Sequence, residues 1–146
     1  MTKNKFIEIP GLNVQSPWGE LIVSGQKTVE TRSYPLPKKH ENVAIAIIET
    51  PGPKKLVSKA RIVGIVIFSH SLKYINVSEW RNDKRRHLID ADHVQFKFDR
   101  KKAKYGWIVK SVVKLPTPLV APKYRGIVFA SKCRVPKDFL SFLTIK

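Results

Sequence analysis

Residues 16–32, SPWGELIVSGQKTVETR, organise the chain, and their pattern predicts a short helix, a glycine stop and a strand. Ser16 is placed to cap the helix, and Pro17 suits its first position, where no backbone N–H is needed. Trp18 and the two aliphatic residues three and four positions later form an apolar face that would pack on a sheet. Gly25 then ends the helix, as a left-handed glycine commonly does. The helix is only about two turns long, so tertiary contacts must stabilise it.

The strand predicted over residues 27–32 carries both signs of charge. Alternate side chains of a strand share a face, so Thr28, Glu30 and Arg32 lie together, and Lys27 joins them only if it precedes the strand proper. Such a cluster can bind a phosphate while the carboxylate accepts a hydrogen bond from a base or a ribose. It can equally shift the pKa of a lysine or a carboxylate toward a value that suits proton transfer, in a cleft that excludes water. The structural alternative is a surface salt bridge of little energetic value.

The composition is strongly basic. The 146 residues include 28 Lys and Arg against 11 Asp and Glu, which gives a formal net charge of +17. A field of this sign attracts polyanions, and nucleic acid is the partner that it favours. Basic runs at residues 38–39, 54–55, 81–87 and 100–104 fall in predicted loops or on a helix exterior, where phosphate contacts would lie. The alternative is a basic surface that serves only solubility.

Other features bear on compartment and cofactors. Cys133 is the only cysteine, which excludes an intrachain disulfide and a cysteine-built zinc site and fits a reducing compartment. The basic N-terminus lacks the apolar run of a signal peptide, and no segment has the length and apolarity of a membrane span. The four histidines show no metal-ligand spacing, and there is no glycine-rich phosphate loop. We expect a cytoplasmic monomer without metal or cofactor.

The remaining pattern is mostly that of short strands. Strands are predicted over residues 5–9, 43–48, 60–68, 94–98, 105–114 and 126–133. Pro10-Gly11 predicts a turn, Pro116 and Pro118 predict the end of a strand, and Gly64 predicts a bulge or a close backbone approach. A second helix is predicted over residues 77–88 with Ser78 as its cap, and a short element over residues 139–145. The chain, residues 1–146, is therefore expected to form one α+β, mainly β domain, a small mixed barrel or curled sheet.

Residues 17–32 resemble the signature of ASCH domains, a family of the PUA-like superfamily. That signature is a Pro-aromatic helix followed by Gly-x-Lys-x-x-Glu-x-Arg, and its places are held here by Gly25, Lys27, Glu30 and Arg32. Looser matches follow in the family's order at residues 60–68, 105–109, 115–118 and 126. The resemblance implies a PUA-like β-barrel of five or six mixed strands with short flanking helices, and a cleft lined by the signature Lys, Glu and Arg.

The resemblance also implies a function. ASCH domains are expected to act in RNA metabolism, so the leading hypothesis is an RNA-binding domain whose cleft takes one base or nucleotide. Some ASCH proteins are acetylcytidine amidohydrolases or ribonucleases, which makes a small hydrolase using Lys27 and Glu30 the second hypothesis. In the amidohydrolases a threonine follows the lysine by three positions, and this chain has Glu30 there. A reader of a modified base in DNA, as in related PUA-like modules, is the third.

The candidate nucleic-acid contacts fall into three groups. The signature group is Lys27, Thr28, Glu30 and Arg32. The rings expected to stack on bases are Trp18, Tyr34 and Tyr124. The basic side chains expected to hold the backbone are Lys38, Lys39, Arg85, Arg86, Lys101 and Lys102. The other two tryptophans and Cys133 are expected to be buried.

Overall fold

The structure, a computed structural model, describes residues 5–53, 55, 59–123, 126 and 128–143. In these described parts of the chain, six strands form one sheet in the order β2-β5-β4-β3-β1-β6. They are β1 (Phe6–Gln15), β2 (Val29–Arg32), β3 (Ala44–Thr50), β4 (Arg61–Tyr74), β5 (Lys104–Val120) and β6 (Phe129–Pro136). The helical segments are α1 (Trp18–Val23), α2 (Val77–Asn82), α3 (Lys84–His87) and the 3₁₀ turns η1 (Lys38–His40) and η2 (Lys137–Phe142).

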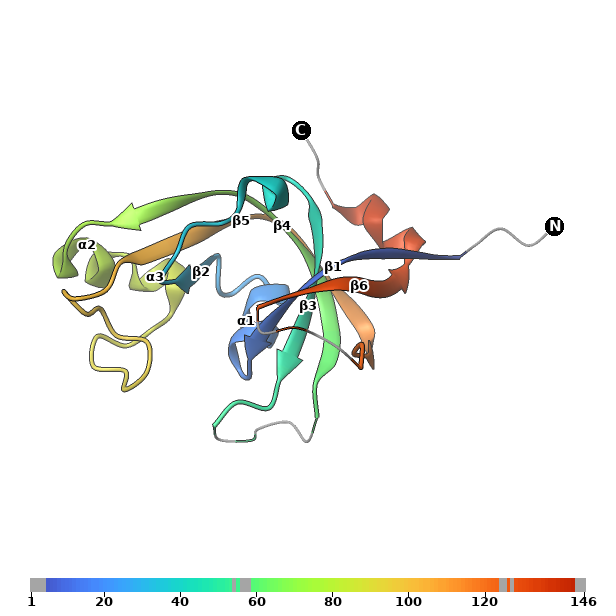
Figure 1. Ribbon diagram of the computed structural model, residues 1–146, viewed down its shortest axis with the longest axis horizontal. Coiled ribbons are helices and arrows are strands. Elements are labelled where there is room, and N and C mark those ends of the chain that lie inside the picture. Colours follow the sequence, from blue (N-terminus) through green and yellow to red (C-terminus); the bar gives the residue numbers. More distant parts are fainter. Residues whose placement is uncertain (1–4, 54, 56–58, 124–125, 127, 144–146) are drawn as a thin grey trace.

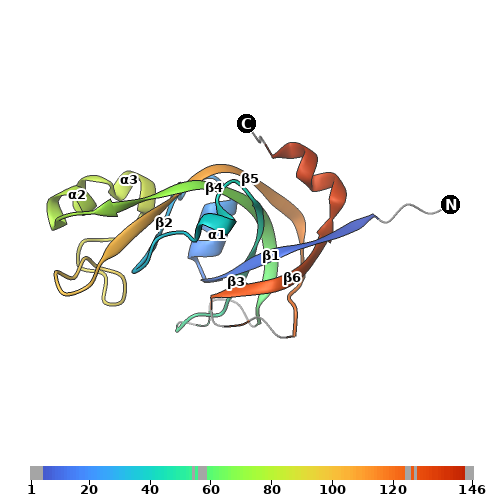
Figure 2. The same ribbon diagram turned by 45° about the horizontal axis from the view of Figure 1, so that its top comes forward.

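The sheet is mixed and strongly curled. β1 and β3 run parallel, and every other neighbouring pair is antiparallel. Figures 1 and 2 show the sheet wrapping around α1, with α2 and α3 at one end of the molecule and η2 at the other. Within the described residues the edge strands β2 and β6 do not pair with each other, so the curl stays open. The expected mainly-β fold of mixed strands with short flanking helices is confirmed.

Alternating side chains divide the interior into two cores. In β3, Ile45 and Ile47 join Ile22 of α1 in one core, while Ile48 belongs to the other, which Leu143 after η2 completes. This alternation is the period-two pattern of a strand buried on both faces. A third, smaller cluster lies beneath α2 and is built around Trp80. Among the described residues, no helix has the length and apolarity needed to cross a membrane.

Gly64 is where α1 sits closest to the sheet. A Cβ added at Gly64 would lie 2.5 Å from Cγ1 of Val23 and 2.6 Å from the carbonyl oxygen of Val113. The pairing of β4 with both neighbours also shifts register beside Gly64. The prediction of a bulge or a close backbone approach at this glycine is therefore confirmed, and both features occur.

Two predicted strand ends are wrong, because prolines that usually break strands lie at bulges here. β1 continues through Pro10-Gly11 to Gln15, and its pairing with β6 shifts register between Ile9 and Gly11. β5 continues to Val120. Pro116 and Pro118 lie between Lys114 and Leu119, where the pairing of β5 with β4 shifts register. A bulge tolerates proline because the missing N–H is not needed by the ladder there.

The region after β4 differs from the prediction in two ways. Residues 94–98 form turns rather than a strand, because His93 Nδ1 accepts the backbone N–H groups of Gln95 and Phe96 at 3.1 and 3.0 Å. The predicted helix over residues 77–88 is split into α2 and α3. Its cap is Asn76, whose side chain accepts the N–H of Glu79 at 2.9 Å, and not Ser78.

Candidate functional site

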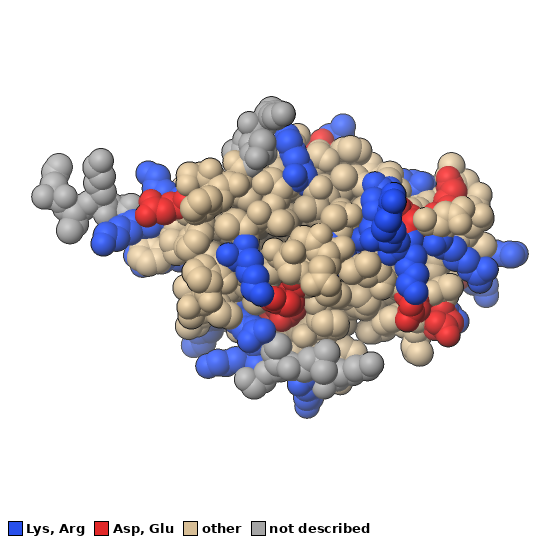
Figure 3. Space-filling view, turned by 180° about the vertical axis from the view of Figure 1, so that it is seen from behind, with Lys and Arg blue, Asp and Glu red and all other residues tan. Residues whose placement is uncertain are grey.

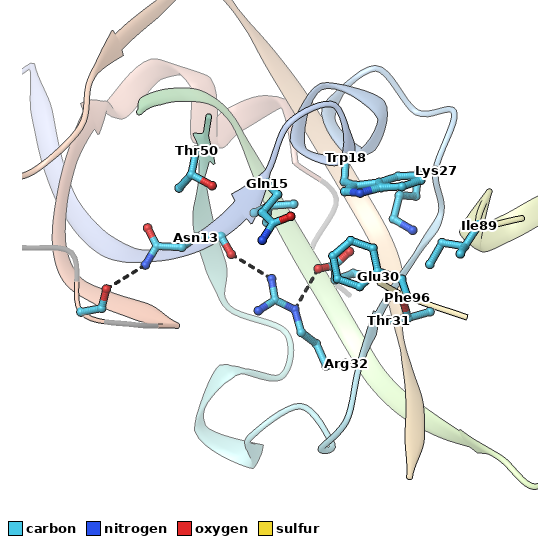
Figure 4. A pocket seen from close by; sticks show the side chains of 12 residues that line it. Asn13, Gln15, Trp18, Lys27, Glu30, Thr31, Arg32, Thr50, Ile89 and Phe96 are labelled. Atoms are coloured by element: carbon cyan, nitrogen blue, oxygen red, sulfur yellow. Dashed lines mark hydrogen bonds and ion pairs between the residues drawn. The ribbon is translucent and has the colours of Figure 1, made fainter. Parts of the chain in front are cut away.

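A cavity of about 330 Å³ opens between the end of β1, α1, β2 and the segment after α3. Figure 4 shows the charged side chains of Lys27, Glu30 and Arg32 directed toward it, with Trp18 and Phe96 as aromatic walls. The rest of the lining includes polar side chains of β1, β2 and β3 and the apolar Ile89. We call this cavity the signature cleft. The structure thus brings the three charged signature residues together.

Lys27 lies on the turn before β2, which is the placement that lets it share a cleft with Glu30. Its side chain is only 1% exposed, Nζ donates to the carbonyl oxygen of His87, and Nζ lies 5.0 Å from the centroid of the Trp18 ring. Burial lowers the pKa of Lys27 to about 8, although the nearby Glu30 carboxylate acts in the opposite direction. Near neutral pH this ammonium is therefore charged but close to titration.

Glu30 and Arg32 form an ion pair on the face of β2 that looks into the cleft. Arg32 Nε donates to Glu30 Oε2 at 2.8 Å, and Arg32 Nη2 donates to the carbonyl oxygen of Asn13 at 2.8 Å. Glu30 is 6% exposed, and the guanidinium of Arg32 lies 5.6 Å from the centroid of the Trp107 ring. Burial and these contacts fix the pair in place, which distinguishes it from a loose surface salt bridge.

Glu49, at the end of β3, binds the first turn of α1, the helix that carries Trp18. This carboxylate is 1% exposed; Oε2 accepts the N–H of Glu20 at 2.7 Å, and Oε1 accepts from Arg61 at 3.3 Å. It satisfies a free N–H of the first turn of α1, so the cap is Glu49 and not the expected Ser16. A Cβ at Gly19 would lie only 3.0–3.1 Å from the Glu49 side chain. A glycine after Trp18 therefore lets the carboxylate reach the helix.

The segment around α3 supplies the acceptor for Lys27. The His87 ring is buried and stacks on Trp80 with centroids 4.7 Å apart, and its Nδ1 accepts the N–H of Ile89 at 2.9 Å. The N–H of Thr28 donates to the carbonyl oxygen of Arg86 at 2.9 Å, which ties α3 to the start of β2. Arg86 is also paired with Asp83 through two hydrogen bonds. Arg86 and Thr28 therefore support the cleft from behind and do not line it.

The predicted stacking rings differ in their surroundings. Trp18 lines the signature cleft, whereas Tyr34 packs edge-on against Trp107 at 5.9 Å and its carbonyl accepts the Trp107 indole N–H at 3.1 Å. Tyr124 lies outside the described residues. Trp107 and Cys133 are fully buried, as is Trp80, which confirms those expectations.

The predicted backbone-holding side chains lie away from the cleft. Lys38, Lys39, Arg85, Lys101 and Lys102 are exposed, and none of them lines the cavity. On the face drawn in Figure 3, Lys and Arg side chains lie at several separate places, many near the rim, with a few acidic residues beside them. On this face the basic charge is therefore spread out and is not gathered in one patch.

Sequence reasoning missed the contribution of β1 and of one lysine. Asn13 and Gln15 line the cleft, and they alternate with the buried Leu12 and Val14. That alternation is visible in the sequence, but ending the strand at Pro10-Gly11 hid it. Lys104, at the start of β5, donates through Nζ to the carbonyl oxygen of Phe96 at 2.7 Å, and it thereby helps to hold a residue that lines the cleft.

Glu30→Gln is expected to lower the pKa of Lys27 below about 8. The Glu30 carboxylate is the main group that favours the charged lysine, and the amide removes its charge while keeping its shape. NMR titration of the Lys27 side chain measures the effect. The exposed Glu8 at the start of β1 provides the control, since Glu8→Gln should leave the titration of Lys27 unchanged. An unaltered Lys27 titration in Glu30→Gln would contradict the coupling.

Among the described residues, no group of three His, Cys, Asp or Glu side chains could hold a metal ion. Comparisons with known proteins identify the fold and the family of the chain. The crystal structure of ASCH from Zymomonas mobilis has a TM-score of 0.62 to this chain, with 17% identity over 90% of each chain. Two mutant forms of that protein give TM-scores of 0.59 and 0.62 at 16% identity, covering 90% and 94% of this chain and 91% and 100% of theirs.

At such identities the structural likeness shows the fold alone. Among curated protein sequences, none matches the chain significantly. The profile of the ASCH domain, however, matches residues 12–116, which is well over half of the chain and includes α1, β2 and the signature cleft residues on them. The chain therefore belongs to the ASCH domain family.

Proposed function

We propose that this chain is an RNA-binding domain whose signature cleft takes one base or nucleotide. The observation that carries the proposal is the convergence of Lys27, Glu30 and Arg32 beside the Trp18 ring in a cavity of about 330 Å³. That volume is at the lower end of the range of about 300–1,000 Å³ typical of small-ligand pockets. A single nucleotide fits this scale better than a large ligand does.

The chemistry of the cleft suits a nucleotide. Glu30 Oε2 is held by Arg32, while Oε1 has no hydrogen-bond partner among the described residues and can accept from a base amino group or a ribose hydroxyl. An ammonium carries three donors, and His87 uses one of those on Lys27, which leaves two for a phosphate or a base carbonyl. The ring of Trp18 offers a stacking surface.

The proposal extends to the protein surface and its setting. The net charge of +17 favours a polyanion, and the exposed basic side chains outside the cleft would contact the phosphate backbone. Membership of the ASCH family, whose PUA-like fold is associated with RNA binding, supports RNA as the nucleic acid. We further propose that the protein acts in the cytoplasm as a monomer, in keeping with its lone, buried cysteine.

Salt should weaken RNA binding steeply. With about four phosphate contacts, the slope of log affinity against log salt is about −3 for a single strand, so affinity should fall roughly fifty-fold between 50 and 200 mM salt. Fluorescence anisotropy of a labelled single-stranded RNA measures this. Replacing the exposed Lys101 and Lys102 with alanine should make the slope shallower. Flat salt dependence would count against the proposal, and stronger competition by a modified duplex DNA would favour the DNA-reader hypothesis.

A second function, hydrolysis of a modified nucleoside or of RNA, is favoured by the state of Lys27. A lysine pKa near 8 leaves some neutral amine close to neutral pH, and neutral amine is the form that can accept a proton. The test is product formation from acetylated cytidine and from RNA by the purified protein. Turnover that Lys27→Ala abolishes would support this function, and a protein inert toward both substrates would argue for binding alone.

A further inference from the structure

A second cavity of about 730 Å³ adjoins the signature cleft. The two share Gln15, Trp18 and Phe96 in their linings, so the Trp18 ring and the Phe96 ring stand at the boundary between them. We call the second cavity the neighbouring cavity. Its remaining wall includes Pro17, Pro53, His93 and Val94, and much of the surface is apolar.

The aromatic rings of the neighbouring cavity are held in place by the chain around them. His93 and Phe96 stack on each other with centroids 5.1 Å apart, and each meets Trp18 edge-on, at 5.7 and 6.2 Å. His93 is fixed further because its Nδ1 accepts two backbone N–H groups of its own loop. A pre-ordered set of rings is the kind of surface on which bases stack with little ordering cost.

The charge of the neighbouring cavity is unlike that of the rest of the molecule. No described Lys or Arg lines it, and its one charged lining residue is Asp92, although the chain as a whole carries +17. Val94 in its wall is 94% exposed, an unusual position for a large aliphatic side chain. An apolar wall with a single carboxylate suits the face and amino edge of a base, and it repels a phosphate.

We propose that the neighbouring cavity holds the base of the nucleotide next to the one in the signature cleft. The domain then binds two successive nucleotides of a single-stranded RNA, one on each side of the Trp18–Phe96 boundary. The shared wall supports this occupant, because the two cavities meet at the same two rings and the next base of the chain can lie on their other side. The inference rests on the proposed function, and it adds a second base-binding position to it.

The test compares ribonucleoside 5′-monophosphates with 5′-phosphorylated ribodinucleotides in calorimetric titrations. The best dinucleotide should bind about ten-fold to a hundred-fold more tightly than the best mononucleotide, the effect of stacking one more base. A dinucleotide with an abasic second ribose carries the same phosphates without the base. It should bind about as weakly as the mononucleotide, which separates stacking from charge.

A matched pair of variants shows whether the tighter binding of the dinucleotide arises in the neighbouring cavity. Val94→Glu adds a carboxylate to the wall of the neighbouring cavity at an exposed position, so it should remove most of the dinucleotide advantage and leave mononucleotide affinity unchanged. Val120→Glu makes the same change at the end of β5, at a valine that is 90% exposed and lines neither cavity. It should preserve the dinucleotide advantage.

The outcomes separate this inference from the proposed function. Equal affinities for mononucleotide and dinucleotide, or a dinucleotide advantage that Val94→Glu leaves intact, would overturn the two-nucleotide inference and leave a one-nucleotide cleft standing. Absence of binding by every mononucleotide, dinucleotide and longer RNA would overturn the proposed function, and the inference would fall with it.

Discussion

Lys27→Met is expected to weaken nucleotide binding by the signature cleft strongly and to leave the protein folded. Hydrogen bonds to a charged group contribute about 1.5–3 kcal/mol each, so affinity should fall by about ten-fold to a hundred-fold or more. Methionine keeps the length and apolar stem of Lys27 beneath the Trp18 ring. The free energy of unfolding at pH 7 should change by less than about 2 kcal/mol, because relief from burying a charge offsets the lost bond to His87.

The same variant tests the lowered pKa of Lys27 through the pH dependence of stability. The folded-state pKa is about 8, and an unfolded lysine has its ordinary value of 10.5, so between these values the unfolded state binds more protons. The free energy of unfolding of the parent should therefore gain a contribution from Lys27 as pH rises from about 8 to 10.5. That contribution should be missing from Lys27→Met. Chemical denaturation across this pH window measures the difference.

A control lysine separates the local role of Lys27 from net charge. Lys114 on β5 is exposed and pairs with Glu20 at the surface, so Lys114→Met removes the same charge without touching the cleft. It should weaken long-RNA binding slightly and leave nucleotide binding unchanged. Equal losses of nucleotide affinity in both variants would show that Lys27 acts only through the overall field.

How far the sequence predicts this site depends on the range of the interactions. Alternation within one strand places Glu30 and Arg32 on one face, and both lie in the cleft. Local patterns also predict the left-handed Gly25, which has φ +85°. The acceptor of Lys27, however, is the carbonyl of His87, sixty positions along the chain. The position of this carbonyl depends on how α3 packs, and no local sequence pattern predicts that packing.

Two of the errors arise where side chains distant in the sequence determine the local structure. Serine is a residue that commonly caps helices, which favours Ser16. The buried Glu49 carboxylate instead reaches the first turn of α1 and takes that role. A Pro-Gly pair commonly forms a turn, but Pro10-Gly11 lies within β1. Gly11 lies so close to Cys133 and Ile48 that a Cβ would clash with both side chains. Here the glycine serves packing between strands.

Gly64→Ala is expected to destabilise the fold strongly, although it adds only one methyl group. The new Cβ would lie 2.6 Å from the backbone carbonyl oxygen of Val113, which the β4–β5 ladder holds in place, and 2.5 Å from Val23 on α1. Overpacking a well-filled site costs about 1–3 kcal/mol, and we expect about 3 kcal/mol or more because one neighbour is backbone. Equilibrium unfolding in urea measures the loss.

Gly25→Ala provides the matched comparison, because it adds the same methyl group with nothing within 4 Å. Its cost comes only from the left-handed backbone and should be about 1–2 kcal/mol. Gly64 also determines how closely α1 approaches the sheet, and α1 carries Trp18 into the cleft. Any Gly64→Ala protein that remains folded should therefore bind nucleotides weakly. Equal destabilisation by the two substitutions would show that the contact at Gly64 relaxes and does not fix the position of α1.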